Sequence, residues 1–159
     1  MDESNINKLR ELTKSLTLRD KELLERHKVF THILDQSTDG YWDWDLVTGN
    51  EFLSENFKMQ LGFEDHEMEN IPDAWMKYCD PDDLGRMQIK MQEHFDSRGT
   101  TNFMTEARFT HKNGSDVWIL CRGAVIEWDE DFKPLRMVGT HTDITECAMK
   151  MIQRLNGGK

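Results

Sequence analysis

Two aspartates alternate with two tryptophans in the segment YWDWDLVTG, residues 41–49. Aromatic rings beside carboxylates are typical of sugar-binding surfaces, and paired carboxylates can act as a general acid and a general base. The same alternation is also typical of one strand of a sheet, with the tryptophans on one face and Asp43 and Asp45 on the other. No histidine or nucleophile lies in register with the aspartates, so we favour the strand over a catalytic pair.

Other motifs of catalysis or metal binding are missing from the sequence. GxSxG, HExxH, P-loop and GxGxxG patterns do not occur, and neither do the signatures of histidine kinases or diguanylate cyclases. The histidines form no pair or His/Cys cluster with ligand spacing; they are His27, His32, His66, His94, His111 and His141. We therefore predict no metal site and no enzymatic activity of this chain itself.

Composition narrows the function further. The 159 residues suffice for one domain and a helical appendage. Thirty acidic residues against twenty basic ones give a net charge of −10, which argues against binding nucleic acid or an anionic membrane surface. The three cysteines have no CxxC spacing and favour a reducing compartment. Without a membrane-spanning apolar run or a signal peptide, we expect a soluble, cytoplasmic protein with no direct membrane insertion.

Residues 4–35 lack Gly and Pro and carry a helical stripe of apolar residues. The stripe fits heptads whose d positions include Arg19 and Arg26, which makes a coiled coil weak. One alternative is an amphipathic helix that lies on its own domain. We favour a homodimer through this helix, because the stripe runs past four heptads. The predicted dimerisation residues are Leu9, Leu12, Leu16, Leu23 and Phe30.

After Ser37 the sequence changes to short alternating segments between turn signals. The expected strands are residues 40–45, 51–54, 101–111, 116–128 and 134–145. The expected helices are residues 55–61 after Ser54 as N-cap, a short one opened by Pro72, residues 80–95 with Asp80 as cap, and a final one beyond Thr145. This order predicts an α+β domain in which helices pack on one face of an antiparallel sheet.

Five segments in register carry a resemblance to a known family: DGYWDWDLVTG, LGF, DPDDLGRM, the HKNGSDVWI region and PLRMVGTHTDITE. In these segments the chain resembles the PAS domain superfamily, particularly the PAS fold-3 subgroup, over about residues 34–146. The resemblance implies a five-stranded antiparallel sheet in the order 2-1-5-4-3. It gives three parts: an N-terminal helix (1–35), the sensor domain (36–146) and the start of a C-terminal signalling helix or tail (147–159).

The resemblance does not point to a haem or flavin cofactor. Haem-binding relatives carry their ligand histidine earlier in the long helix than His94, which we interpret as a surface histidine at the helix end. Light-sensing relatives use a cysteine within Gly-x-Asn-Cys-Arg, whereas Cys79 lies in KYCDPDD and is expected to be structural. Asp80 replaces the histidine that is common in the subgroup, and it caps a helix equally well. A small unidentified ligand is the remaining possibility.

An apolar interior between the helices and the sheet is where such a ligand would bind. Methionine-rich surroundings adapt to a small ligand or simply fill a core, and close packing favours the filled core. Whether Trp42 and Trp44 face this interior or the N-terminal helix is open at this stage. The predicted pocket residues are Met59, Trp75, Met87, Met91, Phe103, Ile119, Cys121 and Val138.

The segment HTDITE is the predicted signal relay, because in PAS domains this triad closes the last strand and starts the helix that leads to the effector. Asp143 is expected to hold the strand end to Lys112 or to the backbone of turn 112–114. Thr145 is expected to be the N-cap of the helix, with Ile144 between the two. The alternative is that the triad only caps the helix and carries no signal.

These predictions combine into one function. The chain is expected to be a PAS sensory and dimerisation module of a larger signalling protein, either a sensor histidine kinase or a cyclic-dinucleotide enzyme, with a C-terminal effector domain as its partner. The alternative is a free-standing small-molecule-binding protein or small enzyme that uses the same pocket. Fold alone does not decide between them.

Overall fold

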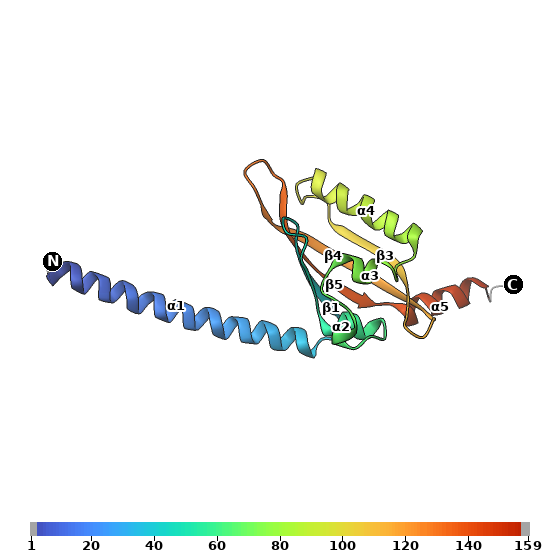
Figure 1. Ribbon diagram of the computed structural model, residues 1–159, viewed down its shortest axis with the longest axis horizontal. Coiled ribbons are helices and arrows are strands. Elements are labelled where there is room, and N and C mark those ends of the chain that lie inside the picture. The colour runs from blue at the N-terminus through green and yellow to red at the C-terminus, as the bar shows by residue number, and fades with distance from the viewer. Residues whose placement is uncertain (1–2, 157–159) are drawn as a thin grey trace. The chain divides into compact units, whose positions relative to one another are not determined.

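The computed structural model describes residues 3–156, without the side chains of residues 3–7, 9–13, 16, 35 and 156. The chain forms two compact units that divide between Ser37 and Thr38. Figure 1 labels the elements, which in chain order are α1 (Glu3–Gln36), β1 (Gly40–Asp45), β2 (Glu51–Leu53), α2 (Glu55–Gln60), η1 (Asp65–Glu67), α3 (Pro72–Met76), α4 (Pro81–Asp96), β3 (Phe103–Thr110), β4 (Asp116–Trp128), β5 (Pro134–Asp143) and α5 (Thr145–Asn156).

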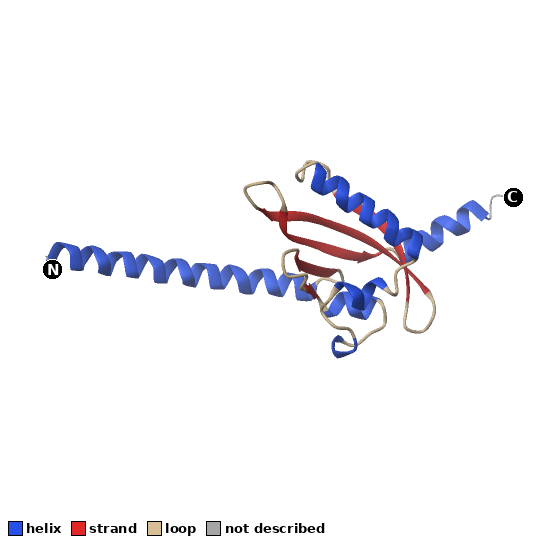
Figure 2. Ribbon diagram, turned by 45° about the horizontal axis from the view of Figure 1, so that its top comes forward, coloured by secondary structure: helices blue, strands red, loops and turns tan. Residues whose placement is uncertain are grey.

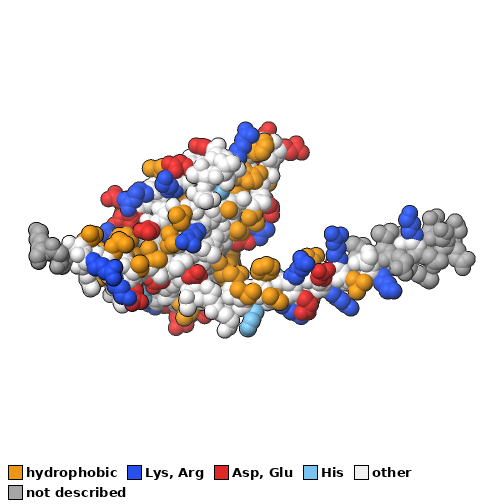
Figure 3. Space-filling model, turned by 180° about the vertical axis from the view of Figure 1, so that it is seen from behind, with side chains coloured by type: hydrophobic (Ala, Val, Ile, Leu, Met, Phe, Trp, Pro, Cys, Tyr) orange, Lys and Arg blue, Asp and Glu red, His pale blue; other side chains and the backbone are white. Residues whose placement is uncertain are grey.

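The first unit is the single helix α1, which confirms the predicted N-terminal helix. Leu23 and Phe30 are 60% and 66% exposed. Figure 3 shows hydrophobic and charged side chains next to one another along the described part of this helix. The side chains of Leu9, Leu12 and Leu16 lie outside the described residues. Dimerisation through this stripe therefore stays a prediction.

The second unit confirms the predicted α+β fold. Its five strands form one antiparallel sheet in the order β2-β1-β5-β4-β3. Figure 2 shows α4 lying along this sheet. Between residues 3 and 156, no helix has both the length and the apolar character that crossing a membrane requires.

The start of α4 is fixed by the carboxylate predicted to cap it. The Asp80 carboxylate accepts hydrogen bonds from the backbone N–H groups of Asp82 and Asp83, at 3.0 and 3.3 Å, and Pro81 opens the helix. The same carboxylate accepts from the Arg108 guanidinium of β3, which lowers the pKa of Asp80. The cap thus also fastens α4 to the sheet.

The two faces of β1 carry different residues, as the alternation predicted. Trp42 and Trp44 lie on the face covered by helices, and Asp43 and Asp45 on the other face. The core lies between this inner face and the helices, and its largest fully buried side chains include Phe57, Phe109, Leu53, Leu61, Ile119 and Met137.

Two glycines in the central strands make room for the Trp42 indole. Gly139 of β5 pairs with Trp42 on one side and with Gly123 of β4 on the other. A Cβ atom at Gly139 would lie 2.4 Å from the Trp42 ring, and one at Gly123 would lie 2.6 Å from it. The ring therefore lies directly over the sheet, where it meets Phe103 edge to face at 6.5 Å.

Candidate functional site

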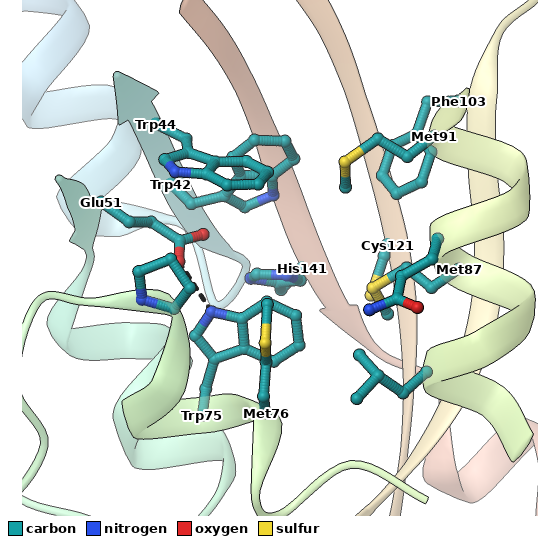
Figure 4. Close-up of a pocket in the computed structure, with 13 residues that line it drawn as sticks. Trp42, Trp44, Glu51, Trp75, Met76, Met87, Met91, Phe103, Cys121 and His141 are labelled. Atoms are coloured by element: carbon teal, nitrogen blue, oxygen red, sulfur yellow. Dashed lines mark hydrogen bonds between the residues drawn. The ribbon is translucent and has the colours of Figure 1, made fainter. Parts of the chain in front are cut away.

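A cavity of about 100 Å³ lies between the inner face of the sheet and helices α3 and α4 (Figure 4). It is much smaller than the 300–1,000 Å³ that is roughly typical of drug-sized ligands, so it suits a ligand of few atoms. Trp42 and Trp44 line it, which answers the question left open by the sequence. The full lining is Trp42, Trp44, Glu51, Pro72, Trp75, Met76, Leu84, Met87, Gln88, Met91, Phe103, Cys121 and His141.

Five of the eight predicted pocket residues line this cavity: Trp75, Met87, Met91, Phe103 and Cys121. The other three are corrected by the structure. Met59 is 60% exposed because it lies on the outer side of α2. Val138 pairs with Asp43, so it lies on the opposite face of the sheet. Ile119 is buried in the core but does not reach the cavity.

Glu51 is the cavity residue with the most unusual surroundings. It is 4% exposed, and its Oε2 accepts a hydrogen bond of 2.7 Å from the indole N–H of Trp75 (Figure 4). Burial raises the pKa of Glu51 from 4.5 to about 7, and the Trp75 bond opposes this rise only in part. The carboxyl therefore changes its charge near neutral pH.

His141 is a second buried titratable group at the cavity. Its ring stacks on Phe57 at 4.0 Å between centroids, and its Nδ1 has no hydrogen-bond partner among the described residues. Burial lowers the pKa of His141 to about 3, so the imidazole is neutral at physiological pH. The indole nitrogens of Trp42 and Trp44 are also buried without a partner in this part of the chain.

Sequence reasoning missed both Glu51 and His141 as cavity residues. The usable signal was strand alternation: Glu51 shares its face with the apolar Leu53, and His141 shares its face with Met137 and Gly139. A polar residue at an inward-facing position of a strand is uncommon, because burial without a partner is costly. Such a position therefore marks a candidate site.

His94 was predicted to be a surface histidine, and the structure corrects this. It is 2% exposed. Its Nδ1 lies 2.5 Å from the carbonyl oxygen of Thr101, and its Nε2 accepts from the Val125 N–H at 3.1 Å. The ring joins the end of α4 to β4, because its two nitrogens match a carbonyl and an N–H.

Asp43 and Asp45 of β1 form hydrogen bonds on the outer face of the sheet. Asp43 forms two hydrogen bonds with the Arg136 guanidinium, at 2.8 and 2.6 Å. Asp45 accepts from the backbone N–H groups of Val47 and Thr48, and the Thr48 bonds lower the pKa of Asp45. Both carboxylates hold the β1–β2 turn and the sheet, which is a structural role.

The predicted relay triad fastens α5 to β4. Asp143 Oδ1 accepts a 2.8 Å bond from the Thr145 N–H, so Asp143 supplies the capping group that was predicted for Thr145. The Thr145 hydroxyl instead accepts from the Trp118 N–H at 2.9 Å, and the Ile144 N–H donates to the Trp118 carbonyl at 2.8 Å. We call these three bonds the α5 latch.

The predicted partner of Asp143 was wrong. The Nζ atom of Lys112 instead lies 2.5 and 2.7 Å from the two carboxylate oxygens of Glu67 in η1. This ion pair lowers the pKa of Glu67. Asp143 bonds within its own segment because the carboxylate of a residue two positions before a helical N–H reaches it without any tertiary contact.

The cavity of this structure is smaller than the ring system of a flavin. A cavity of about 150 Å³ accommodates a single benzene ring. The three-ring isoalloxazine of a flavin therefore needs more space than the roughly 100 Å³ of this cavity. Cys79 is buried away from the cavity, and burial raises the pKa of its thiol to about 11. Within residues 3–156, no group of three or more His, Cys, Asp or Glu side chains could hold a metal ion.

The chain is similar in sequence and in fold to known proteins. A family model described as the PAS fold matches residues 50–141. A comparison with curated proteins found no match. A sensory box histidine kinase/response regulator from Burkholderia thailandensis E264 is 30% identical, with a TM-score of 0.65, and the match covers 80% of this chain and 93% of that chain.

Two further solved structures are similar in fold alone. The N-terminal domain of a diguanylate cyclase with PAS/PAC sensor from Marinobacter aquaeolei is 16% identical, with a TM-score of 0.57, over 68% of this chain and 96% of that one. A light-oxygen-voltage domain studied with a flavin analogue is 13% identical, with a TM-score of 0.53, over 82% of this chain and 96% of that one.

Proposed function

The chain belongs to the PAS family, and on that premise we propose that it is the sensory and dimerisation module of a larger signal-transduction protein. The parent is a sensor histidine kinase or an enzyme of cyclic-dinucleotide metabolism. The module itself catalyses no reaction, and the output activity lies in a C-terminal effector domain. The similarity to a sensory box histidine kinase at 30% identity supports this proposal.

The observation that carries the proposal is that the cavity and the α5 latch share two strands. Cys121 of β4 and His141 of β5 are register partners, and both line the cavity. Two residues along the same strands, Ile119 pairs with Asp143, where the latch begins. The cavity and the start of α5 are therefore separated by only two residues along β4 and β5, so a displacement of these strands at the cavity would also move the start of α5.

In the proposed mechanism, a ligand in the cavity displaces the methionines of α4 relative to β4 and β5. Methionine side chains adapt readily, so Met87 and Met91 are suited to this movement. The resulting movement of the ends of β4 and β5 then changes the equilibrium between two states of α5, a docked one with the α5 latch formed and a released one with it broken. The ligand must bind one of these two states more tightly than the other, since only a difference in affinity shifts an equilibrium.

Dimerisation through α1 is the second part of the proposal. Its exposed hydrophobic side chains recur along the described helix, with Leu23 and Phe30 at the same heptad position. Paired helices would let a shift at the sheet act on both protomers together. We also propose a cytoplasmic location, which the three free cysteines favour.

Substitution of Asp143 by Ala in the full-length parent protein tests the relay. Loss of a helix cap costs about 1 kcal/mol, roughly a fivefold change in the ratio of docked to released α5. We expect the response of the output activity to be weakened by a similar factor, and hydrogen exchange of the Thr145 amide to be faster.

Two control variants accompany this test. Asp143→Asn keeps an oxygen acceptor and should retain the response. Asp129→Ala removes a carboxylate that likewise accepts backbone N–H bonds, from Asp131 and Lys133 in the β4–β5 loop, and should leave the response intact. An unchanged response in Asp143→Ala, together with faster exchange at Thr145, would refute the relay.

A further inference from the structure

The cavity is lined by one acidic side chain and by no positively charged side chain that would balance it. Among its lining residues, Glu51 is the only acid, and none is Lys or Arg. The neighbouring titratable groups do not supply a positive charge. His141 of β5 is neutral because burial lowers its pKa to about 3, and Cys121 of β4 stays protonated because burial raises the pKa of its thiol. From α4 the lining includes neutral side chains only, among them Gln88. Helix α3 contributes Pro72, Trp75 and Met76 to the lining, whereas its Asp73 does not line the cavity.

Aromatic rings surround the space that faces this carboxyl. Figure 4 shows Trp42 and Trp44 on one side of Glu51 and Trp75 on the other, with Phe103 across the cavity. The face of an aromatic ring attracts a cation, and indole does so most strongly. Three indoles and a buried carboxyl around a small space are the groups that recognise an organic cation.

We propose that the cavity binds a small organic cation of the methylated ammonium type, with the Glu51 carboxylate as its counter-ion. The inference rests on the proposed function, because it names the ligand class of the same sensory cavity. The space of about 100 Å³ is smaller than the roughly 150 Å³ that holds a benzene ring, so the cation enters with displacement of Met87 and Met91, the movement proposed above. An anion is disfavoured, because it would meet the ionised Glu51 in a desolvated site.

The unpaired indole nitrogens add one further requirement on the ligand. The N–H groups of Trp42 and Trp44 are buried donors without an acceptor among the described residues. A neutral oxygen elsewhere in the ligand, such as a hydroxyl, would accept from one of them. A hydroxyalkyl ammonium such as choline therefore has the expected combination of groups.

Proton linkage gives the proposal a pH signature. Burial holds the pKa of Glu51 at about 7, so the carboxyl is mostly ionised at pH 8 and mostly protonated at pH 6. A cation that binds only the ionised form binds in proportion to its population. We expect the affinity to fall about tenfold from pH 8 to pH 6.

Isothermal titration calorimetry of the whole chain at pH 8 tests the proposal with three probes of one shape. They are choline, its neutral carbon analogue 3,3-dimethyl-1-butanol, and the carboxylate 3,3-dimethylbutanoate. We expect choline to bind, the neutral analogue to bind at least about tenfold more weakly, and the carboxylate to give no binding heat.

Two variants locate the site. Glu51→Gln keeps an oxygen for the Trp75 N–H but removes the charge, and it should weaken choline binding at least about tenfold. Glu106→Gln removes the same charge from the exposed face of β3 and should leave binding unchanged. The comparison of choline with its neutral analogue uses the unmodified chain, so it decides the question even if a variant fails to fold.

Equal affinity for the neutral analogue, tighter binding of the carboxylate, or no binding of choline would each overturn the inference. These outcomes are separate from the relay. If choline binds but Asp143→Ala leaves the parent's response unchanged, the proposed function fails and this inference stands. If choline does not bind while Asp143→Ala weakens the response, this inference alone fails.

Discussion

The buried carboxyl of Glu51 should make the stability of the protein depend on pH, and Glu51→Gln should remove that dependence. Glu51 is 4% exposed, and its carboxyl accepts a hydrogen bond from the Trp75 indole N–H. Glutamine has nearly the same shape and can accept the same bond, so the variant changes the charge and little else. The comparison of the two proteins therefore isolates the titration of one group.

The sign and size of the effect follow from the two pKa values. In the unfolded chain the Glu51 carboxyl loses its proton near its ordinary pKa of 4.5, whereas in the folded protein it loses it at about 7. Below pH 4.5 both states are protonated and the group costs nothing. As the pH rises to 7, the unfolded state binds fewer protons, so the free energy of unfolding falls. At 1.36 kcal/mol for each pKa unit, the loss above pH 7 amounts to about 3 kcal/mol.

Urea denaturation of both proteins from pH 5 to pH 8.5 measures this difference. We expect Glu51→Gln to be more stable than the unmodified protein by about 1 kcal/mol near pH 5 and by about 3 kcal/mol at pH 8. His141, whose pKa of about 3 destabilises the fold as the pH falls below its ordinary 6.5, affects both proteins equally. A stability difference that does not change between pH 5 and pH 8.5 would refute the reasoning.

Two further predictions concern the sheet and the N-terminal helix. Gly139→Ala should lower the free energy of unfolding by at least about 2 kcal/mol, because its Cβ would lie 2.0 Å from the Arg122 carbonyl oxygen. The control Gly85→Ala on α4 has open space around it and should stabilise the protein slightly. Equal effects of the two substitutions in urea titrations would contradict this explanation. Phe30→Glu should raise the dissociation constant of the proposed dimer at least about tenfold, as measured by analytical ultracentrifugation. The control Leu24→Glu lies on the same helix but outside the a and d positions and should leave the dissociation constant unchanged. An equal loss of affinity in both variants, or no dimer of the unmodified chain, would contradict the heptad assignment.

The fold was largely predictable because its signals are local. The caps at Ser54 and Asp80, the alternation of Trp42 to Asp45, and the turn at residues 112–114 each act within a few residues, and each appears in the structure. The strand order came from the resemblance, because no local pattern states which strands pair. The 3₁₀ turn Asp65–Glu67 was not predicted.

The site was predictable only in part because it depends on register. Met59 and Val138 were assigned to the interior by residue type, whereas their positions on α2 and β5 turn them outward. His94 was judged by its place near a helix end, and only the approach of Thr101 and Val125 gives it two buried partners. Long-range contacts of this kind leave no mark in the local sequence.

The cost of Glu51 to stability also bears on how the module could respond to a ligand. A leucine at this position would occupy the space of the Glu51 side chain without a desolvation penalty, so packing alone gives no reason for a carboxyl there. A bound cation would offset the loss of folding free energy that ionisation of Glu51 causes. It would do so only in the state of the domain in which the cation can contact the carboxylate. That difference in free energy is what a relay requires, because a ligand shifts an equilibrium only by its differential affinity for the two states. Among the lining residues, His141 lies nearest to Asp143 along β5. The Glu51 carboxyl, which destabilises the domain when it is ionised without a cation, would therefore supply the difference in free energy that acts on the α5 latch.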